Sequence, residues 1–334
     1  MGCDYCPDSD LFAPCTCYQD VITCINTADD LDLDEKFTQL ANGAPKGLYN
    51  TFILEDNYIT SLPASLFHGI RFKHIILNGC SKLSCVNPNA FNGLGDDIQT
   101  FTSDISDFSA PKNQTCDLFG ALSTLKNVVS IKITGSNVPE IPDNAFSQPL
   151  GPLKYLEQID FGGSRTPGKL TKIGHNAFST LNNLQLVDLS RQAIASIGAE
   201  AFAMSTRSND VLEINLEMNR LSGPGFGQRV FPLNRPVTVH LNGNMNLTQL
   251  PETAFYDMLA AGGHDRNRVY ITGPQMEIDR NNLWLVQNKV QLDLKNKLFG
   301  ALGADGRPLL DHTVKQMDKD PANFTINDNF YDMD

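Results

Sequence analysis

The feature of this sequence that most constrains its fold is a short phrase that returns along the chain at a nearly constant distance. Each copy of the phrase begins with an aliphatic or turn residue, continues with small or polar residues and ends with Phe, as in residues 141–146, Ile-Pro-Asp-Asn-Ala-Phe. A fixed period of about 20 to 50 residues is the signature of a solenoid, in which each repeat packs against its neighbours. Six versions of the phrase are found, at residues 62–67, 87–91, 141–146, 173–178, 197–202 and 250–255.

A short run of alternating apolar and polar residues precedes the phrase, as at residues 52–59 and 214–221. Alternation with a period of two predicts a β-strand that buries one of its faces. The second inward residues of these runs are Leu54, Leu77, Ser103, Ile133, Phe161, Leu189, Leu216, Leu241 and Ile271, at steps of 23, 26, 30, 28, 28, 27, 25 and 30. The spacing predicts nine coils of about 27 residues.

The pattern L-x-x-L-x-L-x-x-N-x-L followed by L-P-x-x-A-F is that of the leucine-rich repeat. Its inward Leu and Ile stack from coil to coil, its Asn caps backbone groups where the strand turns, and its Phe fills the convex side. Five coils substitute at the Asn position, with Cys80, Ser136, Ser164, Gln192 and Pro274. We therefore predict an α/β fold, a right-handed solenoid with a parallel sheet on its concave side and short helices or irregular turns on its convex side.

A solenoid exposes an apolar face at each end unless a cap covers it. We expect residues 1–47 to form a cysteine-rich N-terminal cap with an acidic helix that starts near Asp30 and ends near Gly43, and residues 48–282 to form the solenoid. Residues 283–334 contain no cysteine. They are expected to form a C-terminal cap without disulfides, closed by a helix or a last strand near residues 290–294, and an acidic tail.

Eight cysteines lie in the first 116 residues, five of them before position 25. An even number of clustered cysteines predicts disulfides in a secreted protein, and three N-x-S/T sites, at Asn113, Asn246 and Asn323, agree with glycosylation outside the cell. We expect Cys116 to join Cys85 or Cys80 across neighbouring coils. A zinc knuckle built on the N-terminal cysteines is the alternative, and their spacing and the lack of a nearby His disfavour it.

The chain begins with Met1, Gly2 and Cys3 and has no apolar signal segment before the cysteines. We expect a mature secreted chain that starts with an added Met. Myristoylation of Gly2 is the alternative, but its motif needs Ser or Thr at the sixth position and finds Cys6.

The net charge of −12 has the wrong sign for binding nucleic acid, and no apolar stretch is long enough to span a bilayer. A P-loop-like stretch at 163–170 lacks the Ser or Thr that binds magnesium, and the acidic run at 30–34 lacks the Gly of a calcium loop. No nucleophile motif lies near any of the six His residues. We therefore expect no enzyme activity, no cofactor and no metal, although a hydrolase triad assembled from distant coils stays open.

The outward strand positions are free to bind a partner because they take no part in the core. The central outward row reads Ile53, Ile76, Thr102, Lys132, Asp160, Asp188, Asn215, His240 and Tyr270, flanked by Glu157, Arg191, Glu213 and Glu217. We expect the binding residues to be Lys132, Asp160, Asp188, Arg191, Glu213, Asn215, Glu217, His240 and Tyr270. The acidic middle of the row favours a basic or polar protein surface as the partner. There are two alternatives. The charges could serve only to keep the face soluble, or the chain could be a structural or storage protein that self-associates. The sequence leaves open whether the protein forms homo- or hetero-oligomers.

The spacing Cys6-Pro7-x7-Cys15-x-Cys17-x6-Cys24 resembles the N-terminal cysteine cap of extracellular leucine-rich-repeat proteins, and this resemblance implies the bridges Cys6–Cys17 and Cys15–Cys24. Together with residues 52–57 and 62–67, the N-terminal stretch resembles a group of secreted arthropod leucine-rich-repeat proteins. That group includes the non-catalytic subunit of a coelenterazine-oxidising shrimp luciferase. The resemblance implies a partner or stabiliser of another secreted protein, with no chemistry of its own.

Overall fold

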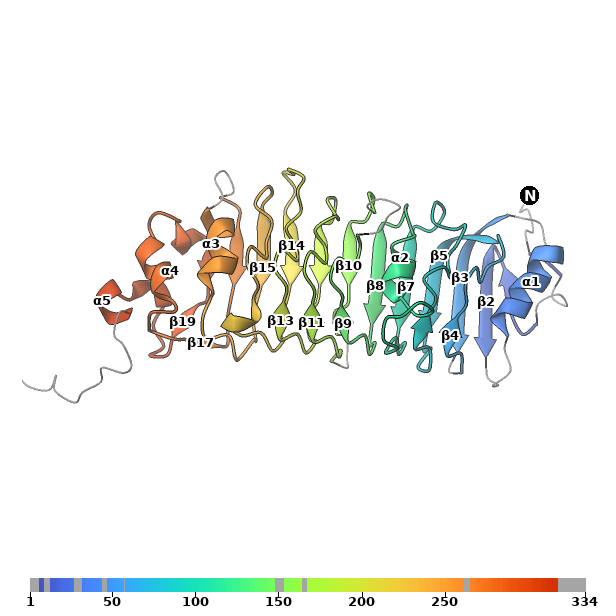
Figure 1. Cartoon of the computed structure of the whole chain (residues 1–334), viewed down its shortest axis with the longest axis horizontal. Helices are drawn as coiled ribbons and strands as arrows, with labels where there is room; N and C mark the ends of the chain where they lie inside the picture. Colours follow the sequence, from blue (N-terminus) through green and yellow to red (C-terminus); the bar gives the residue numbers. More distant parts are fainter. Residues whose placement is uncertain are drawn as a thin grey trace, which may run out of the picture.

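One long β-sheet runs from end to end of the molecule (Figure 1). The computed structural model describes residues 6–8, 13–26, 32–43, 47–56, 58–147, 153–163, 167–260 and 265–317. The strands of this sheet, in spatial order, are β1 (Thr16–Tyr18), β2 (Val21–Asn26), β3 (Leu48–Asp56), β5 (Arg71–Asn78), β7 (Thr100–Asp104), β8 (Ser130–Thr134), β10 (Gln158–Asp160), β12 (Leu186–Asp188), β14 (Leu212–Asn215), β15 (Val237–His240), β16 (Arg268–Tyr270) and β18 (Leu298–Phe299).

Spatial order follows sequence order, and every neighbouring pair in the long sheet is parallel except β1 and β2. Strands β3 to β16 are the nine predicted coils, and the predicted solenoid with its parallel concave sheet is confirmed. Within the described residues, shorter strands line a second side of the coils: β4 (Ser61–Leu62) with β6 (Cys85–Val86), β9 (Glu140–Ile141) with β11 (Lys172–Ile173) and β13 (Ser196–Ile197), and β17 (Gln275–Met276) with β19 (Leu302–Gly303).

The helices are few and short, as expected for the convex side of such coils. The described residues form α1 (Leu33–Gly43), α2 (Leu118–Leu122), α3 (Glu252–Ala260), α4 (Leu283–Asn288) and α5 (Val314–Met317), and the 3₁₀ turns η2 (Gly223–Gly225), η3 (Leu294–Asn296) and η4 (Leu309–Asp311).

The inward positions of the long sheet form a continuous buried ladder. All nine residues predicted for it are at most 2% exposed, including Ser103, whose Oγ is hydrogen-bonded to Ser106 Oγ at 2.7 Å. A column of Phe rings fills the opposite side of the core, as the closing phrase predicts. The ring centroid of Phe178 lies 5.8 Å from that of Phe146 and 4.9 Å from that of Phe202.

The predicted capping role of the repeat's Asn is confirmed at Asn219. Its Nδ2 donates to the carbonyl oxygens of Leu189 and Leu216, at 2.9 and 3.0 Å, and its Oδ1 accepts from the N–H of Ile194 at 3.0 Å. One buried amide therefore satisfies backbone groups of two successive coils, which fixes their spacing.

Disulfides join Cys6 to Cys17, Cys15 to Cys24, and Cys85 to Cys116. The first two are the bridges that the N-terminal resemblance implies. Cys116 was expected to join Cys85 or Cys80, and the structure selects Cys85. Cys80 is buried with its Sγ 3.7 Å from the carbonyl oxygen of Leu54, in the place of the repeat's Asn. Cys3 lies outside the described residues.

Helix α1 confirms the predicted acidic helix from Leu33 onward, with Asp34 and Glu35 in its first turn where the helix dipole favours negative charge. It covers the first coil through Phe37, whose ring centroid lies 5.3 Å from that of Phe52 and 4.8 Å from that of Phe67. The N-terminal end of the core is thereby closed.

The closing element expected near residues 290–294 is displaced by a few residues. The segment itself is a turn that leads from α4 into η3, in which Leu292 and Leu294 are buried and Val290 is 86% exposed, and a strand follows at β18. The last strand of the long sheet is β18, because Lys297 and Leu298 bring the chain back beside β16 only after that turn. The domain boundaries at 47 and 282 stay predictions, and the long sheet crosses both. The expected acidic tail beyond Met317 lies outside the described residues.

Candidate binding surface

The nine residues predicted for the central outward row lie side by side in the long sheet. Register pairs link Ile53 to Ile76, Ile76 to Thr102, Thr102 to Lys132, Lys132 to Asp160, Asp160 to Asp188, Asp188 to Asn215, Asn215 to His240, and His240 to Tyr270. We call this row and its flanking residues the concave face.

Three polar residues in the middle of the row have a structural role. Asp160 Oδ1 accepts the N–H of Gly162 at 2.8 Å, and Asp188 Oδ1 accepts the N–H of Ser190 at 2.9 Å. Asn215 repeats this contact in the next coil, with the N–H two residues further on. Short polar side chains that bind the second following N–H form tight turns, so the fold itself favours Asp or Asn where each strand ends.

Gly162 leaves room for two of these carboxylates. A Cβ on Gly162 would lie 2.9 Å from Asp188 Oδ1 and 3.0 Å from Asp160 Oδ1. Asp160 also pairs with Lys132, with Nζ 3.2 Å from Oδ2. The middle of the concave face is therefore packed and partly neutralised.

Arg191 does not lie on a strand. It follows β12 by three residues, has a φ of 53°, and is exposed at the edge of the sheet. The structure therefore separates it from the central row.

Two glutamates flank His240 on the C-terminal part of the face. His240 Nε2 lies 3.2 Å from Glu213 Oε1 and Nδ1 lies 3.9 Å from Glu217 Oε1. Nε2 is out of line for a hydrogen bond and, within the described residues, has no hydrogen-bond partner. Glu217 is held in turn by Asn242, whose Nδ2 donates to its Oε1 at 2.5 Å.

Three rings stack beside this acidic pair. The centroid of Tyr270 lies 5.1 Å from that of His240 and 5.1 Å from that of Phe299, with interplanar angles of 10° and 18°. Phe299 is in register with Tyr270 and extends the row by one coil. Sequence reasoning missed it, although the alternation Leu298-Phe299-Gly300 was available as a signal, because the last strand was placed earlier.

The N-terminal part of the central row carries the uncharged residues Ile53, Ile76 and Thr102. Beside it, His74 Nδ1 and Thr100 Oγ1 share a hydrogen bond of 2.8 Å. Burial, with a smaller contribution from Lys73, lowers the pKa of His74 below its ordinary value. Within the central row, the charged and aromatic residues therefore lie from β8 onward.

Within the described residues, no group of three or more His, Cys, Asp or Glu side chains is arranged to hold a metal ion. In the same part of the chain, no helix has the length and apolar character needed to cross a bilayer. Asn113 and Asn246 are exposed, while Asn323 lies outside the described residues.

A comparison with protein families agrees with this architecture over part of the chain. Residues 102–222 match six copies of the BspA type leucine rich repeat region. These residues, less than half of the chain, carry the leucine-rich repeat within the solenoid described above. Among curated proteins no sequence matches the chain, so its resemblance to the secreted arthropod group stays a prediction.

Three solved structures are similar to this chain over much of its length. Human 5T4 (Wnt-activated inhibitory factor 1, trophoblast glycoprotein) is 16% identical, with a TM-score of 0.48 over 92% of this chain and 99% of its own. The Drosophila Toll–Spatzle complex is 14% identical, with a TM-score of 0.46 over 77% of this chain and 34% of its own. The TLR13–ssRNA13 complex is 16% identical, with a TM-score of 0.38 over 74% of this chain and 45% of its own. The chain spans less than half of each of the last two chains.

Proposed function

We propose that this protein is an extracellular, non-enzymatic binding or scaffolding protein that presents its concave face to a protein partner. The observation that carries the proposal is the C-terminal part of that face, where Glu213 and Glu217 flank the stacked rings of His240, Tyr270 and Phe299. Leucine-rich repeats expose such sheets as extended binding surfaces, and the three disulfides fit an oxidising, extracellular environment.

The chemistry of this region favours a basic segment of the partner. Glu213 keeps 54% of its side chain exposed, and aromatic rings at an interface supply large contact area at small conformational cost. An arginine or lysine of the partner would meet both carboxylates at the edge of the ring stack. Asp160, Asp188 and Asn215 contribute less, because turn contacts already hold them. A role as the non-catalytic subunit or stabiliser of a secreted complex is the finer form of this proposal.

The test is capture of partners from the extracellular fluid of the producing organism with purified protein. We expect the double variant Glu213→Lys and Glu217→Lys to lose the partner that the unchanged protein captures. The matched control is Glu252→Lys with Asp257→Lys on the exposed side of α3, which changes the charge equally and should keep the partner. Equal capture by both double variants would overturn the concave site. Light scattering after size-exclusion chromatography distinguishes this function from self-association. If the protein self-associated, its measured molar mass would rise with protein concentration.

A further inference from the structure

The second side of the solenoid is interrupted at the third coil. Strands β4 and β6 close the first two coils, and β9, β11 and β13 close the fourth to sixth, but these are two separate sheets. The third coil begins with β7. It has a loop and helix α2 at the place where a closing strand would join the two short sheets. Strand β9 is therefore the edge of its sheet (Figure 1).

The third coil does not join the short sheets on the second side of the solenoid, because a loop replaces its closing strand. The N–H of Phe108 donates to the carbonyl of Leu83 at 2.8 Å, so the chain first follows the second coil. Pairing with that coil resumes only where the N–H of Asp117 donates to Val86, also at 2.8 Å. The disulfide from Cys116 to Cys85 holds the end of the loop against the second coil and away from β9.

Strand β9 pairs with β11 on one side only, and among the described residues no strand pairs with its other side, which faces the interruption. The N–H of Asn137 donates to Asp107 at 2.9 Å, and within the described residues no backbone hydrogen bond joins residues 138–142 to the third coil. The carbonyls of Pro139 and Ile141 point the opposite way and accept N–H groups of the fifth coil. Since successive residues of a strand direct their backbone groups to opposite sides, the N–H and C=O of Glu140 face the interruption.

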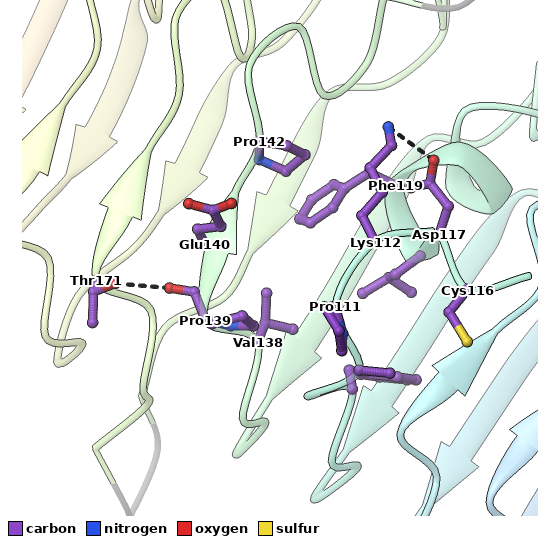
Figure 2. Close-up of a pocket in the computed structure, with 13 residues that line it drawn as sticks. Pro111, Lys112, Cys116, Asp117, Phe119, Val138, Pro139, Glu140, Pro142 and Thr171 are labelled. Carbon is purple, nitrogen blue, oxygen red and sulfur yellow. Dashed lines mark hydrogen bonds and ion pairs between the residues drawn. The ribbon is translucent and has the colours of Figure 1, made fainter. Parts of the chain in front are cut away.

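A cavity of about 430 Å³ lies in this interruption (Figure 2). Figure 2 shows Pro139, Glu140 and Pro142 on one wall and Pro111, Lys112 and Phe119 on the other. Its lining is mostly apolar, which suits the side chains of a peptide, and its volume is within the range of about 300 to 1,000 Å³ typical of ligand sites. Lys112 is already paired with Asp117 at 2.9 Å, while Glu140 keeps 51% of its side chain exposed.

We propose that this interruption is a second binding site, which takes an extended peptide segment of a partner as an added strand beside β9. The segment carries a basic residue in register with Glu140, followed by a branched aliphatic residue in register with Ile141. Strand addition to an exposed edge draws its affinity from backbone hydrogen bonds and its specificity from alternate side chains.

The fifth coil shows which side chains β9 accepts. On that side of β9, Lys172 is in register with Glu140, with Nζ 3.9 Å from Oε2, and Ile173 is in register with Ile141. Lys172 is half exposed, whereas Ile173 is completely buried. A Lys-Ile pair on the open side would repeat this arrangement, with the lysine near the exposed carboxylate and the isoleucine beside the buried Ile141. The site is distinct from the concave face and does not depend on the function proposed for that face.

The probe is a fluorescein-labelled, blocked peptide with the sequence of residues 168–175, Gly-Lys-Leu-Thr-Lys-Ile-Gly-His. We expect saturable binding to the full chain by fluorescence anisotropy, and slower hydrogen exchange of the Glu140 amide when the peptide is bound. Glu140→Lys should weaken binding roughly five- to tenfold, because a cross-strand attraction becomes a repulsion. A peptide with Glu in place of its second Lys should recover affinity for this variant.

Glu200→Lys is the matched control, since this exposed carboxylate also lies beside a basic side chain, Arg229, away from the cavity. It should bind the peptide like the unchanged protein, as should the concave variant Glu213→Lys with Glu217→Lys. Absence of saturable binding, equal loss in both single variants, or unchanged exchange at Glu140 would overturn the proposal. Loss of peptide binding in the concave variant would place the peptide on the concave face and overturn the edge site alone.

Discussion

The N-terminal cap is closed by covalent bonds between its cysteines, whereas the C-terminal cap relies on buried lysine and histidine side chains. At the N-terminus, Cys24 is completely buried on β2 and joined to Cys15. At the C-terminus, Lys297 is 7% exposed and its Nζ donates to the carbonyl of Leu259 at 2.7 Å, at the end of α3. Each arrangement covers the apolar coil at its own end of the solenoid, which would otherwise meet water.

His312 organises the rest of the C-terminal cap. It is 1% exposed, and its ring lies between two oxygens: Nδ1 is 3.1 Å from the carbonyl of Leu309, and Nε2 is 3.1 Å from Asp305 Oδ2. Lys289 Nζ donates to the carbonyl of Leu310 at 2.7 Å. These contacts stabilise only the folded state, whereas a disulfide also restricts the unfolded chain. The two caps should therefore respond differently to reduction, mutation and acid.

The largest effect is expected from breaking the N-terminal cap. Removing the bridge with Cys15→Ser and Cys24→Ser should destabilise the fold by roughly 2 to 5 kcal/mol, the usual effect of losing a native disulfide. Leu189→Ala in the central coil removes a completely buried side chain and has a similar expected effect of roughly 2 to 5 kcal/mol. We expect the cysteine variant to have the lower melting temperature, because the cap also shields the coils behind it. An equal or smaller decrease, measured by calorimetry, would show that the cap is only an appendage.

A smaller and more local effect is expected at the C-terminal cap. His312→Ala removes the ring's contacts with the Leu309 carbonyl and with Asp305 Oδ2, and should destabilise the cap by roughly 1 to 3 kcal/mol. Hydrogen exchange should become faster in α4 and β18 while β3 and β5 remain protected. His175→Ala, at an exposed histidine of the fifth coil, is the control and should change neither region. Faster exchange throughout the chain would mean that both caps act on the whole solenoid, and the contrast between them would disappear.

The same contrast explains which parts of the molecule the sequence predicts. The nine coils and the outward row follow from periodicity, because those positions repeat a pattern. The N-terminal disulfides were implied by the resemblance of the cysteine cluster to known N-terminal caps. The C-terminal cap repeats nothing, so β18 and the contact of Lys297 with Leu259 could not be read from local sequence. The interruption beside β9 was missed for a related reason. An irregular third coil is visible in the sequence, but the edge that it exposes depends on how Cys85–Cys116 directs the loop.

The smallest effect, and the one that separates the caps most selectively, is expected in acid. Arg307 lowers the pKa of Asp305 to about 2, chiefly through its Nε–H, which donates to Oδ2 at 2.7 Å, and His312 adds a weaker contact. A carboxyl whose pKa is lower in the folded state than its ordinary value stabilises the fold above that ordinary value, near pH 4. This contribution is lost as the pH falls toward 2, when Asp305 takes up a proton and no longer accepts from Arg307. We therefore expect the C-terminal cap to lose hydrogen-exchange protection between about pH 4 and pH 2, before the disulfide-bonded N-terminal cap. Asp305→Asn should abolish this pH dependence, and Asp311→Asn on η4 should retain it. Simultaneous loss of protection at both ends, or a pH profile unchanged in Asp305→Asn, would show that another group governs the response of the cap to acid.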